Sequence, residues 1–578
     1  YNAASISSYV ENVLQLEAVA CKDWLTNKVD RSVTGRIALQ QTTGSVQLPL
    51  NNVAVIALEY AGPAGMATSL GHAPVAGLIN AAAGSRLAIA EALTNIVWAP
   101  LKNEIKGISL SANWMWPCRN EGEDARLYQA VEAASNFAIE LGINIPTGKD
   151  SLSMTQKYPD GEVILSPGTV IISAGSEVTD IRKCVTPVVK KTQGESYLYY
   201  IDFSKSEFNL GGSALAQTLN EVGDKAPDVT DTPYFAKAFN VLQKMISDNQ
   251  VVAGHDISSG GLITSLLEMN FANNWSGMDI DITSIGEKDA VKVLFSEKPA
   301  VVVQCEQASA IEKVLHNNGI IFYKIGKVTG ERSIRVKTAE NTFSIDIDAN
   351  RDTWYKTSYL LDRNQSTEKL ALERFQNYKN QELKYKFPAN FAGKFANLGI
   401  DPFRTNPTGV KAAIIREKGV NGDREMAYAM HLAGMDVKDV HMTDLISGRE
   451  DLEDVNMIVF VGGFSNSDVL GSAKGWAGAF LYNPKAKQAL ENFYKRNDTL
   501  SLGVCNGCQV MIELELLTPD HDKKPRMRHN SSHKFESIFL NVDVPQNNSV
   551  MLKTLAGSRL GIWVAHGEGK FELPYEES

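Results

Sequence analysis

The sequence is poor in cysteine, with six in 578 residues, and no apolar run reaches the roughly 18 residues that a membrane-spanning helix needs. So few cysteines cannot form a disulfide framework in a chain of this length, and we therefore expect a reducing compartment, the cytoplasm. The first residues contain no charged and then apolar leader, so secretion is not indicated. Because the chain starts at Tyr1 and stops at Ser578, just after a strand-like run, we expect it to be a fragment.

Basic residues are not in excess, since 57 Lys and Arg stand against 67 Asp and Glu, a formal net charge of −10. A negative chain repels the phosphates of nucleic acids and anionic membranes on average, so we expect neither as a partner. A local basic pocket for a small phosphorylated ligand is compatible with this balance. At roughly 100–200 residues per domain, the length predicts about three to five domains.

Hydrophobic periodicity predicts four regions: residues 1–185, 186–347, 348–408 and 409–578. In the first region, helical spacing covers 5–26, 81–97 and 124–141, and strand-like runs cover 46–58, 163–165 and 169–174. In the second, strands are predicted at 196–202, 300–304 and 320–325. Residues 351–406 are rich in Lys, Gln, Asn and Glu and contain at most one predicted helix, which is typical of a connector.

The last region alternates strands with helices. Strand-like runs cover 411–415, 437–441, 457–461 and 500–504, and helical patterns cover 424–435 and 509–516. Such alternation is typical of a parallel, doubly wound sheet.

The strongest chemical signal lies where the last strand meets its helix. Gly503, Cys505 and Gly507 form the nucleophile-elbow pattern, in which a sharp turn strains the central residue and only glycine fits on either side. Cys505 is expected at the carboxyl end of a strand and at a helix N-terminus, whose dipole and free amides stabilise a thiolate. We predict that Cys505 is a nucleophile and that the amides of Asn506 and Gly463 hold an oxyanion.

Three other interpretations of Cys505 are weighed against this one: half of a zinc site, a redox pair with Cys508, and a buried structural cysteine. Zinc needs two more ligands. The nearest suitable pair, His529 and His533, lies in a basic stretch rich in Asn and Ser, which is typical of a surface loop. The matching glycines favour the nucleophile.

A second candidate site lies in the first two regions. Glu91 and Asn95 are four residues apart on a predicted helix, so their oxygens should face one side. Asp256 precedes a Ser-Ser-Gly-Gly turn that starts at Ser258 and enters a predicted helix at 262–271, whose free amides suit phosphate. Carboxylate and amide oxygens beside phosphate are what Mg²⁺ prefers, but Glu and Asn at this spacing usually mark an ordinary solvated helix.

Several segments together resemble a known family. They are residues 85–95, 110–114, 122–124, 146–154, 210–217, 254–262, 416–421, 462–468 and 503–509. The chain resembles the large, single-chain phosphoribosylformylglycinamidine synthases of purine biosynthesis over essentially its whole length. The resemblance implies an α/β and α+β multidomain fold, with two aminoimidazole ribonucleotide synthetase-like domains followed by a doubly wound, flavodoxin-like class I glutaminase domain. It also implies that a first synthetase half, absent here, belongs to the same polypeptide.

The same resemblance assigns roles to the second candidate site. Residues matching Glu91, Asn95 and Asp256 coordinate Mg²⁺ in the family, and those matching Asn51 and Ser258 contact a nucleotide. The implied cofactors are Mg²⁺ and ATP or ADP, held in an auxiliary site.

Two departures weaken this assignment. Asn52 stands where the family usually has a Mg²⁺-binding aspartate, and Ser259 stands where the turn usually has aspartate. An amide in place of a carboxylate removes charge, which predicts fewer Mg²⁺ ions or weaker nucleotide binding.

In class I glutaminases, a histidine in a His-Pro-Glu motif activates the cysteine, yet none of the nine histidines here precedes proline. The resemblance places His566 and Gln509 in the glutamine pocket, and it places the base and its acid beyond Ser578. We therefore predict that this chain alone hydrolyses glutamine very poorly.

The implied function is that of an ATP-dependent ligase and glutamine amidotransferase. Glutamine is hydrolysed at Cys505, and ammonia passes to a centre where formylglycinamide ribonucleotide, activated by ATP, becomes the amidine. One alternative is a non-catalytic nucleotide-binding scaffold with a silent glutaminase. Another is a stand-alone ATP-dependent kinase or synthetase, against which the attached elbow argues.

Overall fold

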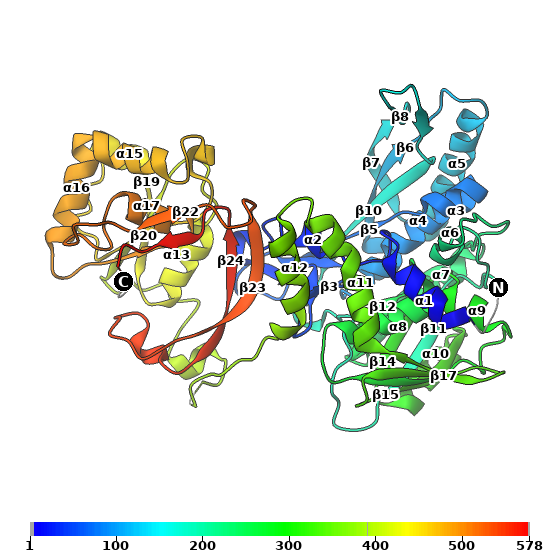
Figure 1. Ribbon diagram of the computed structural model, residues 1–578. Coiled ribbons are helices and arrows are strands. Elements are labelled where there is room, and N and C mark those ends of the chain that lie inside the picture. The colour runs from blue at the N-terminus through cyan, green and yellow to red at the C-terminus, as the bar shows by residue number, and fades with distance from the viewer. Residues whose placement is uncertain (1–4, 390, 576–578) are drawn as a thin grey trace. The chain divides into compact units, whose positions relative to one another are not determined.

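The computed structural model describes residues 5–389 and 391–575, which form two compact units (Figure 1). Unit 1 comprises the described residues up to Trp24, Ala38–Asn364 and Ala371–Glu382, and unit 2 comprises Leu25–Ile37, Gln365–Leu370 and the described residues from Leu383 onward. Within this described part, no helix has both the length and the apolar character required to cross a bilayer. The boundaries predicted at residues 185, 347 and 408 stay predictions. The chain ends on which the fragment expectation rests, residues 1–4 and 576–578, lie outside the described residues.

The first sheet of unit 1 has six strands in the order β1-β4-β5-β10-β6-β7. Their bounds are β1 Ile37–Leu39, β4 Ala54–Ala57, β5 Gly65–Gly71, β6 Ser109–Met115, β7 Asn144–Ser151 and β10 Thr169–Val178. Buried and exposed residues alternate strictly along β5, because successive side chains of a strand point to opposite faces. Helix α4 (Ala81–Ile96) packs on the buried face so closely that a Cβ on Gly71 would lie 2.3 Å from the Ala88 carbonyl oxygen.

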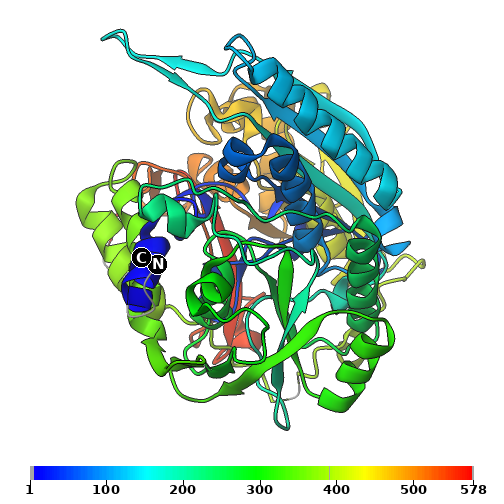
Figure 2. The same cartoon turned by 90° about the vertical axis from the view of Figure 1, so that its right-hand side faces the viewer.

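Helices α4 and α5 (Glu123–Leu141) pack against each other (Figure 2) and confirm the helices predicted at 81–97 and 124–141. The strand-like run at 46–58 is interrupted, because only β3 (Leu48–Pro49) and β4 are extended. Asn51 and Asn52 lie between these two strands, and the interruption places both at the edge of a cavity described below.

The second sheet of unit 1 has seven strands in the order β12-β14-β11-β15-β13-β16-β17. Their bounds are β11 Tyr197–Asp202, β12 Ala253–Asp256, β13 Gly277–Asp281, β14 Ala300–Cys305, β15 Phe322–Thr329, β16 Ser333–Lys337 and β17 Thr342–Asp346. Helices α7 (Thr232–Ser247) and α8 (Gly261–Phe271) belong to the same part of the chain. One hydrophobic core contains Ile172 of the first sheet together with Tyr199 and Val301 of the second, which explains why both sheets form one unit.

The predicted connector contains two helices, not one: α11 (Ile347–Asp362) and α12 (Glu368–Asn377). Helix α11 is rich in polar residues, yet it buries Trp354 and Tyr355 in a hydrophobic core of unit 1. Its polar composition concealed this buried stripe, so the prediction of little structure was wrong for these residues.

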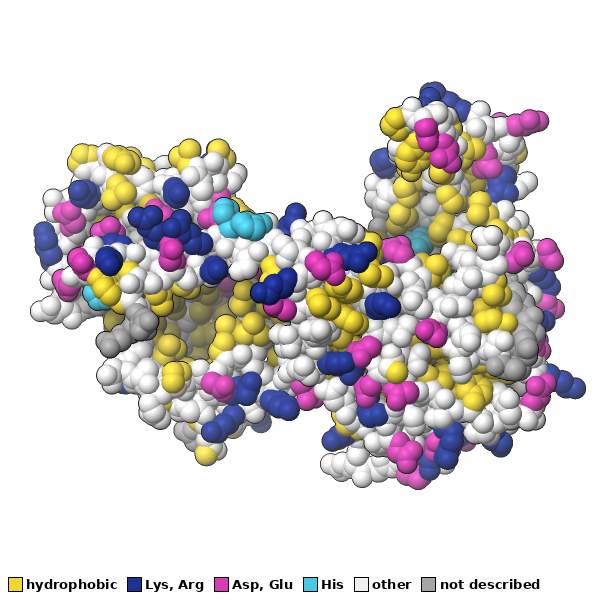
Figure 3. All heavy atoms as spheres, in the orientation of Figure 1, with side chains coloured by type: hydrophobic (Ala, Val, Ile, Leu, Met, Phe, Trp, Pro, Cys, Tyr) yellow, Lys and Arg dark blue, Asp and Glu magenta, His cyan; other side chains and the backbone are white. Residues whose placement is uncertain are grey.

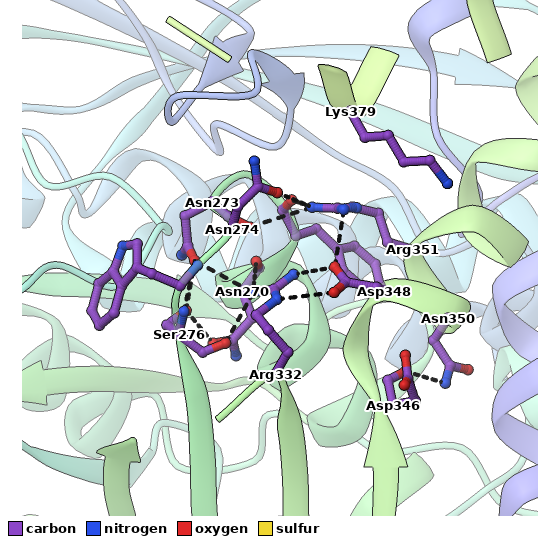
Figure 4. Close-up of polar contacts among 12 residues, drawn as sticks. Asn270, Asn273, Asn274, Ser276, Arg332, Asp346, Asp348, Asn350, Arg351 and Lys379 are labelled. Carbon is purple, nitrogen blue, oxygen red and sulfur yellow. Dashed lines mark hydrogen bonds and ion pairs between the residues drawn. The ribbon is translucent and has the colours of Figure 1, made fainter. Parts of the chain in front are cut away.

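The buried Arg351 and the half-buried Arg332 hold α11 in place within unit 1 (Figure 4). Arg351 Nη1 donates to the carbonyl oxygens of Phe271 and Asn273, at 3.0 and 3.3 Å, and Arg351 Nη2 lies 2.9 Å from Asp348 Oδ1. Arg332 approaches the same Asp348 carboxylate at 2.6 Å. Because Arg351 is only 3% exposed, its charge depends on these partners.

Unit 2 contains a four-stranded parallel sheet in the order β19-β18-β20-β21, which confirms the predicted parallel arrangement. The strands are β18 Lys411–Arg416, β19 Asp436–His441, β20 Met457–Phe460 and β21 Leu500–Gly503. The helices are α13 Asp423–Leu432, α14 Met442–Ser447, α15 Lys474–Tyr482, α16 Pro484–Lys495 and α17 Asn506–Glu513. All four residues of β20 are buried, as expected for a strand covered on both faces.

A segment from early in the chain completes unit 2. The Ser537 amide on β23 (Glu536–Asp543) donates to the Asn27 carbonyl oxygen at 2.9 Å. The buried Arg31 guanidinium donates to the Ser537 carbonyl oxygen at 2.9 Å and lies over the Trp563 ring on β24 (Arg559–His566). Residues 25–37 therefore belong with a sheet more than 500 residues later in the sequence.

Candidate active site and nucleotide cavity

Cys505 lies between β21 and α17 with φ 55° and ψ −114°, a conformation that a residue with a Cβ adopts only under strain. The flanking glycines allow this turn. A Cβ on Gly503 would lie 2.7 Å from the Gly507 carbonyl oxygen, and a Cβ on Gly507 would lie 2.0 Å from the Phe460 carbonyl oxygen. The backbone geometry of the predicted nucleophile elbow is therefore present.

Cys505 lines a cleft of about 770 Å³ in unit 2. The other residues predicted for the glutaminase site line the same cleft: Gly463, Asn506, Gln509 and His566. They come from the turn after β20, from the elbow and α17, and from the end of β24. The structure brings these residues together, while their chemical roles stay predictions.

Burial is the largest influence on the Cys505 thiol, and it raises the thiol pKa above the ordinary value. The backbone amides of Gly463 and Asn506 face the sulfur and lower the pKa, whereas the carboxylates of Asp30 and Asp468 raise it. The net direction is upward. The two amides thus act in the expected direction and favour the thiolate, but desolvation outweighs them.

This raised pKa predicts a steep pH dependence of Cys505 alkylation. Only the thiolate reacts, so we expect the rate with iodoacetamide to rise about tenfold per pH unit between about pH 7 and pH 9. Mass spectrometry of the Cys505 peptide measures this rate. A plateau below about pH 8 would show a lowered pKa and contradict the prediction.

The Asn506 side chain, which is 1% exposed, is the centre of a hydrogen-bond network that the sequence analysis missed. Its Oδ1 accepts from Ser465 Oγ at 2.6 Å, and its Nδ2 donates to Asp468 Oδ1 and to Gln509 Oε1, both at 3.1 Å. Gln509 Nε2 donates to the Glu568 carbonyl oxygen at 3.0 Å, so both ends of the Gln509 amide are engaged within the protein. Ser465 and Asp468 carried no sequence signal except their position within the family-like segment 462–468.

Three histidines line the cleft, of which His566 was predicted. Burial lowers the pKa of His566, which favours its neutral form. His529 and His533 lie at the surface, as predicted, with ring centroids 6.0 Å apart, and both line the cleft. Within residues 5–389 and 391–575, no group of three or more His, Cys, Asp or Glu side chains is arranged to hold a metal ion, so the zinc interpretation is not carried further.

A second cavity, of about 710 Å³, lies in unit 1. Five of the six residues predicted for Mg²⁺ and nucleotide line it: Asn51, Asn52, Asn95, Asp256 and Ser258. The sixth, Glu91, lines a neighbouring cavity of about 180 Å³ that shares Ser258. Glu91 accepts from the His72 amide at 3.0 Å, whereas Asn95 donates to the Leu70 carbonyl oxygen at 3.0 Å. Both side chains therefore reach the same end of β5, as their shared helix face implies, although they line adjoining cavities. Their proposed roles stay predictions.

Three buried polar atoms of the larger cavity have no hydrogen-bond partner within the described part of the chain: Asn51 Oδ1, Asn52 Nδ2 and Asp256 Oδ2. Buried polar atoms without partners cost free energy unless a ligand or water satisfies them. The two oxygens suit a divalent cation, whereas the Asn52 nitrogen is a donor and suits a phosphate oxygen. The cavity therefore fits a phosphorylated ligand with a cation, with less negative charge than an aspartate at position 52 would give.

Two carboxyl groups of the smaller cavity have pKa values raised toward physiological pH. Burial raises the pKa of Glu91 to about 8, an effect that the His72 amide opposes and that Asp256 and Glu297 increase. Burial also raises the pKa of Glu297 to about 7, and this residue accepts from the Gly260 amide at 2.7 Å. The sequence analysis missed Glu297, which carries no motif signal of its own.

His255 links Asp256 to a second carboxylate. Its Nδ1 lies 3.0 Å from Asp256 Oδ1, and its Nε2 lies 3.0 Å from Glu268 Oε2. Burial lowers the pKa of His255, but the hydrogen bonds to both carboxylates outweigh it and raise the pKa to about 10. The cationic ring thus holds one oxygen of Asp256, and the other oxygen has no partner among residues 5–389 and 391–575.

Comparison with known proteins relates these sites to one family. Residues 21–177 match the FGAR-AT PurM_N-like domain, residues 204–338 match the C-terminal domain of AIR synthase related proteins, and residues 409–578 match the CobB/CobQ-like glutamine amidotransferase domain. The probable phosphoribosylformylglycinamidine synthase, chloroplastic/mitochondrial, of Arabidopsis thaliana is 40% identical over 98% of this chain and 40% of its own length. The Homo sapiens phosphoribosylformylglycinamidine synthase is 39% identical over 98% of this chain and 43% of its own length. The chain is a homologue of part of phosphoribosylformylglycinamidine synthase.

The chain spans about two fifths of the length of these curated synthases. The matched domains confirm the predicted fold class, two synthetase-like domains and a glutaminase domain. The solved structure "T. maritima PurL complexed with FGAR" is 12% identical, with a TM-score of 0.42 over 61% of this chain and 54% of that chain, which is too distant to inform either site. The two departures from the synthase pattern, Asn52 and Ser259, line the larger and the smaller cavity of unit 1, respectively.

Proposed function

We propose that this chain supplies the glutaminase nucleophile and an auxiliary nucleotide site for the glutamine- and ATP-dependent conversion of formylglycinamide ribonucleotide to formylglycinamidine ribonucleotide, in concert with a first synthetase half. The observation that carries this proposal is the elbow at Cys505, a strained turn whose sulfur faces two backbone amides in an open cleft. A merely structural cysteine would need neither the strain nor the amides.

In the proposed reaction, the Cys505 sulfur attacks the side-chain carbonyl carbon of glutamine. A C–S bond forms, and the carbonyl electron pair moves to oxygen, where the amides of Gly463 and Asn506 stabilise the negative charge. When this intermediate collapses, the electron pair returns from oxygen, the C–N bond breaks and ammonia leaves, its nitrogen having taken up the proton that the Cys505 thiol lost. Water then hydrolyses the thioester, which gives glutamate and restores the thiol. We propose that neutral His566 shapes the glutamine pocket and is not the base.

The nucleotide part of the proposal concerns the cavity in unit 1. Asp256, with the amide oxygens of Asn51 and Asn95, would hold Mg²⁺ beside the phosphates of ATP or ADP, and the turn at Ser258 would hold phosphate. When bound, Mg²⁺ neutralises phosphate charge. His255 fixes the orientation of Asp256, and Glu91, in the neighbouring cavity, adds no second charge while its carboxyl group is protonated.

The nucleophile is tested by labelling with a chloroketone analogue of glutamine. We expect one adduct, on Cys505, and at least about 10²-fold slower labelling of Cys508, because only Cys505 lies between the oxyanion amides. The variant Cys505→Ser should give no adduct, whereas Cys508→Ser should label as the parent does. The glutaminase proposal would be overturned if Cys505 and Cys508 were labelled at equal rates, or if added glutamine did not slow the labelling of either cysteine.

A non-catalytic scaffold is the second candidate function, and the amide at Asn52 is the observation that favours it.

Titration with MgADP distinguishes a cavity that binds nucleotide from a vestigial one. We expect Asn52→Asp to tighten MgADP binding about tenfold or more by returning a carboxylate, and Asp256→Asn to abolish its Mg²⁺ dependence. Unchanged affinity in both variants would remove these residues from the site, and tight binding by the parent chain would contradict a vestigial cavity. The cytoplasmic location stays a prediction.

A further inference from the structure

Asn506 is placed to do more than donate its backbone amide. Its buried side chain hydrogen-bonds Ser465 and Asp468, in the loop that follows Gly463, and Gln509, on α17. One residue therefore supplies one amide at the sulfur and also contacts the segment that carries the other amide, that of Gly463.

The loop that Asn506 contacts is strained. Asn466, Ser467 and Asp468 have φ values of 52°, 55° and 49°, three consecutive left-handed residues of which none is glycine. Left-handed backbone is unfavourable for residues other than glycine, so the turn persists only where its surroundings hold it. The Asp468 carboxylate accepts from the Ala473 amide at 3.2 Å and from Asn506 Nδ2 at 3.1 Å, which restrains the turn from two sides.

We propose that Asn506 is a positioning residue whose side chain sets the separation of the two oxyanion donors by tying α17 to the strained turn at 465–468. The inference rests on the proposed glutaminase function. Donors in an oxyanion site act only within a few tenths of an ångström of their correct positions, so a loop that relaxes away from α17 loses the Gly463 contact. The network also engages Gln509, which transmits the same restraint to the Glu568 backbone.

The decisive variant is Asn506→Asp, which keeps the shape and the acceptor for Ser465 but loses both donated bonds and places a carboxylate against Asp468. The double variant Asn506→Asp/Asp468→Asn reverses donor and acceptor and restores that bond. The matched control is Asn456→Asp. It makes the same change beside Asp498, 3.5 Å from Asn456 Nδ2, at the N-terminal end of β20 and away from the cleft.

The probe is the γ-semialdehyde of glutamate, an aldehyde analogue of glutamine. The Cys505 sulfur adds to its carbonyl carbon, and the carbonyl oxygen takes the thiol proton. The product is a thiohemiacetal whose oxygen occupies the oxyanion position. The affinity of the aldehyde is measured in the full chain as the protection of Cys505 from iodoacetamide. It is divided by the protection that glutamate gives in the same variant, so that effects of the variant on the thiol pKa and on pocket binding cancel. We expect Asn506→Asp to weaken aldehyde protection about 10²-fold and the double variant to recover at least about tenfold of that loss. Asn456→Asp should stay within about threefold of the parent.

The outcomes separate the two proposals. If the aldehyde fails to protect Cys505 in the parent chain, the glutaminase function itself fails. If it protects the parent and Asn506→Asp equally, only the positioning role is overturned. Should circular dichroism show that Asn506→Asp does not fold, the fallback variants are Ser465→Ala and Asp468→Ala, each of which removes one bond of the network. Aldehyde affinity within threefold of the parent in both variants would equally refute the positioning role.

Discussion

Replacing Gly463 by alanine is expected to lower the reactivity of Cys505 toward glutamine analogues by about 10²–10³-fold. Gly463 has φ 125°, a conformation nearly restricted to glycine. A Cβ there would lie 2.5 Å from Val420 Cα and 2.6 Å from the Asn421 nitrogen, both of them backbone atoms that cannot yield separately. The turn must therefore move and carry its amide away from the sulfur.

The measurement is the rate of Cys505 labelling by the chloroketone, compared with iodoacetamide labelling at the same pH. Gly478→Ala is the matched control, because Gly478 lies in α15 and a Cβ there would meet only the Tyr482 ring at 3.8 Å. That variant should label normally and gain up to about 1 kcal/mol of helix stability. Normal chloroketone labelling of Gly463→Ala would mean that the Gly463 amide does not hold the oxyanion.

The second large effect concerns the stability of unit 1. Replacing Arg351 by methionine is expected to lower the free energy of unfolding of unit 1 by about 3–5 kcal/mol. The long apolar side chain fills part of the space, but it leaves the carbonyl oxygens of Phe271 and Asn273 without their donor (Figure 4). Asp348 keeps Arg332 but loses its second cation.

The urea midpoint and the hydrogen exchange of peptides from α8 and α11 report this loss. The control is Arg335→Met, since Arg335 pairs with Asp279 at 2.8 Å but its side chain is 63% exposed. An exposed ion pair contributes less than about 1 kcal/mol, so this variant should unfold close to the parent. If the two variants have equal midpoints, the buried network does not anchor α11.

The elements that sequence patterns predicted well are those whose signal is local. Helix α4 was predicted because small and apolar residues recur at helical spacing without proline, and β20 because it is a short run of large apolar residues. The region 351–406 was predicted to contain at most one helix, yet α11 and α12 both form. The buried stripe of α11 has helical spacing but includes Arg351, Ser358 and Asp362, which count as polar, so its hydrophobic pattern is weak. The bridging role of residues 25–37 carried no local signal, because their partners lie near residue 537.

The candidate sites show the same division. The glycines around Cys505 indicated the elbow directly, because only one backbone geometry requires them. The net pKa of Cys505 could not be predicted, since the sequence shows the helix N-terminus but not the burial that outweighs its amides. Glu91 and Asn95 share a helix face by their spacing and both bond to the end of β5, but the sequence does not show that they line two adjoining cavities.

The distribution of charged side chains over the surface cannot be predicted from the net charge. On the face shown in Figure 3, basic and acidic side chains are interspersed over both units, which the net charge of −10 does not reveal by itself. Net charge sets the average interaction with a polyanion, whereas local arrangement sets each site.

The sequence by itself determined the elbow at Cys505, the predicted nucleophile, and the parallel sheet beneath it, because steric rules and hydrophobic periodicity act between neighbours in the chain. Only the tertiary structure decided the hydrogen-bond network of Asn506, the raised pKa of Cys505 and the separation of Glu91 from Asn95. Hydrogen bonding and desolvation depend on atoms brought together from distant segments. No local pattern encodes which segments these are.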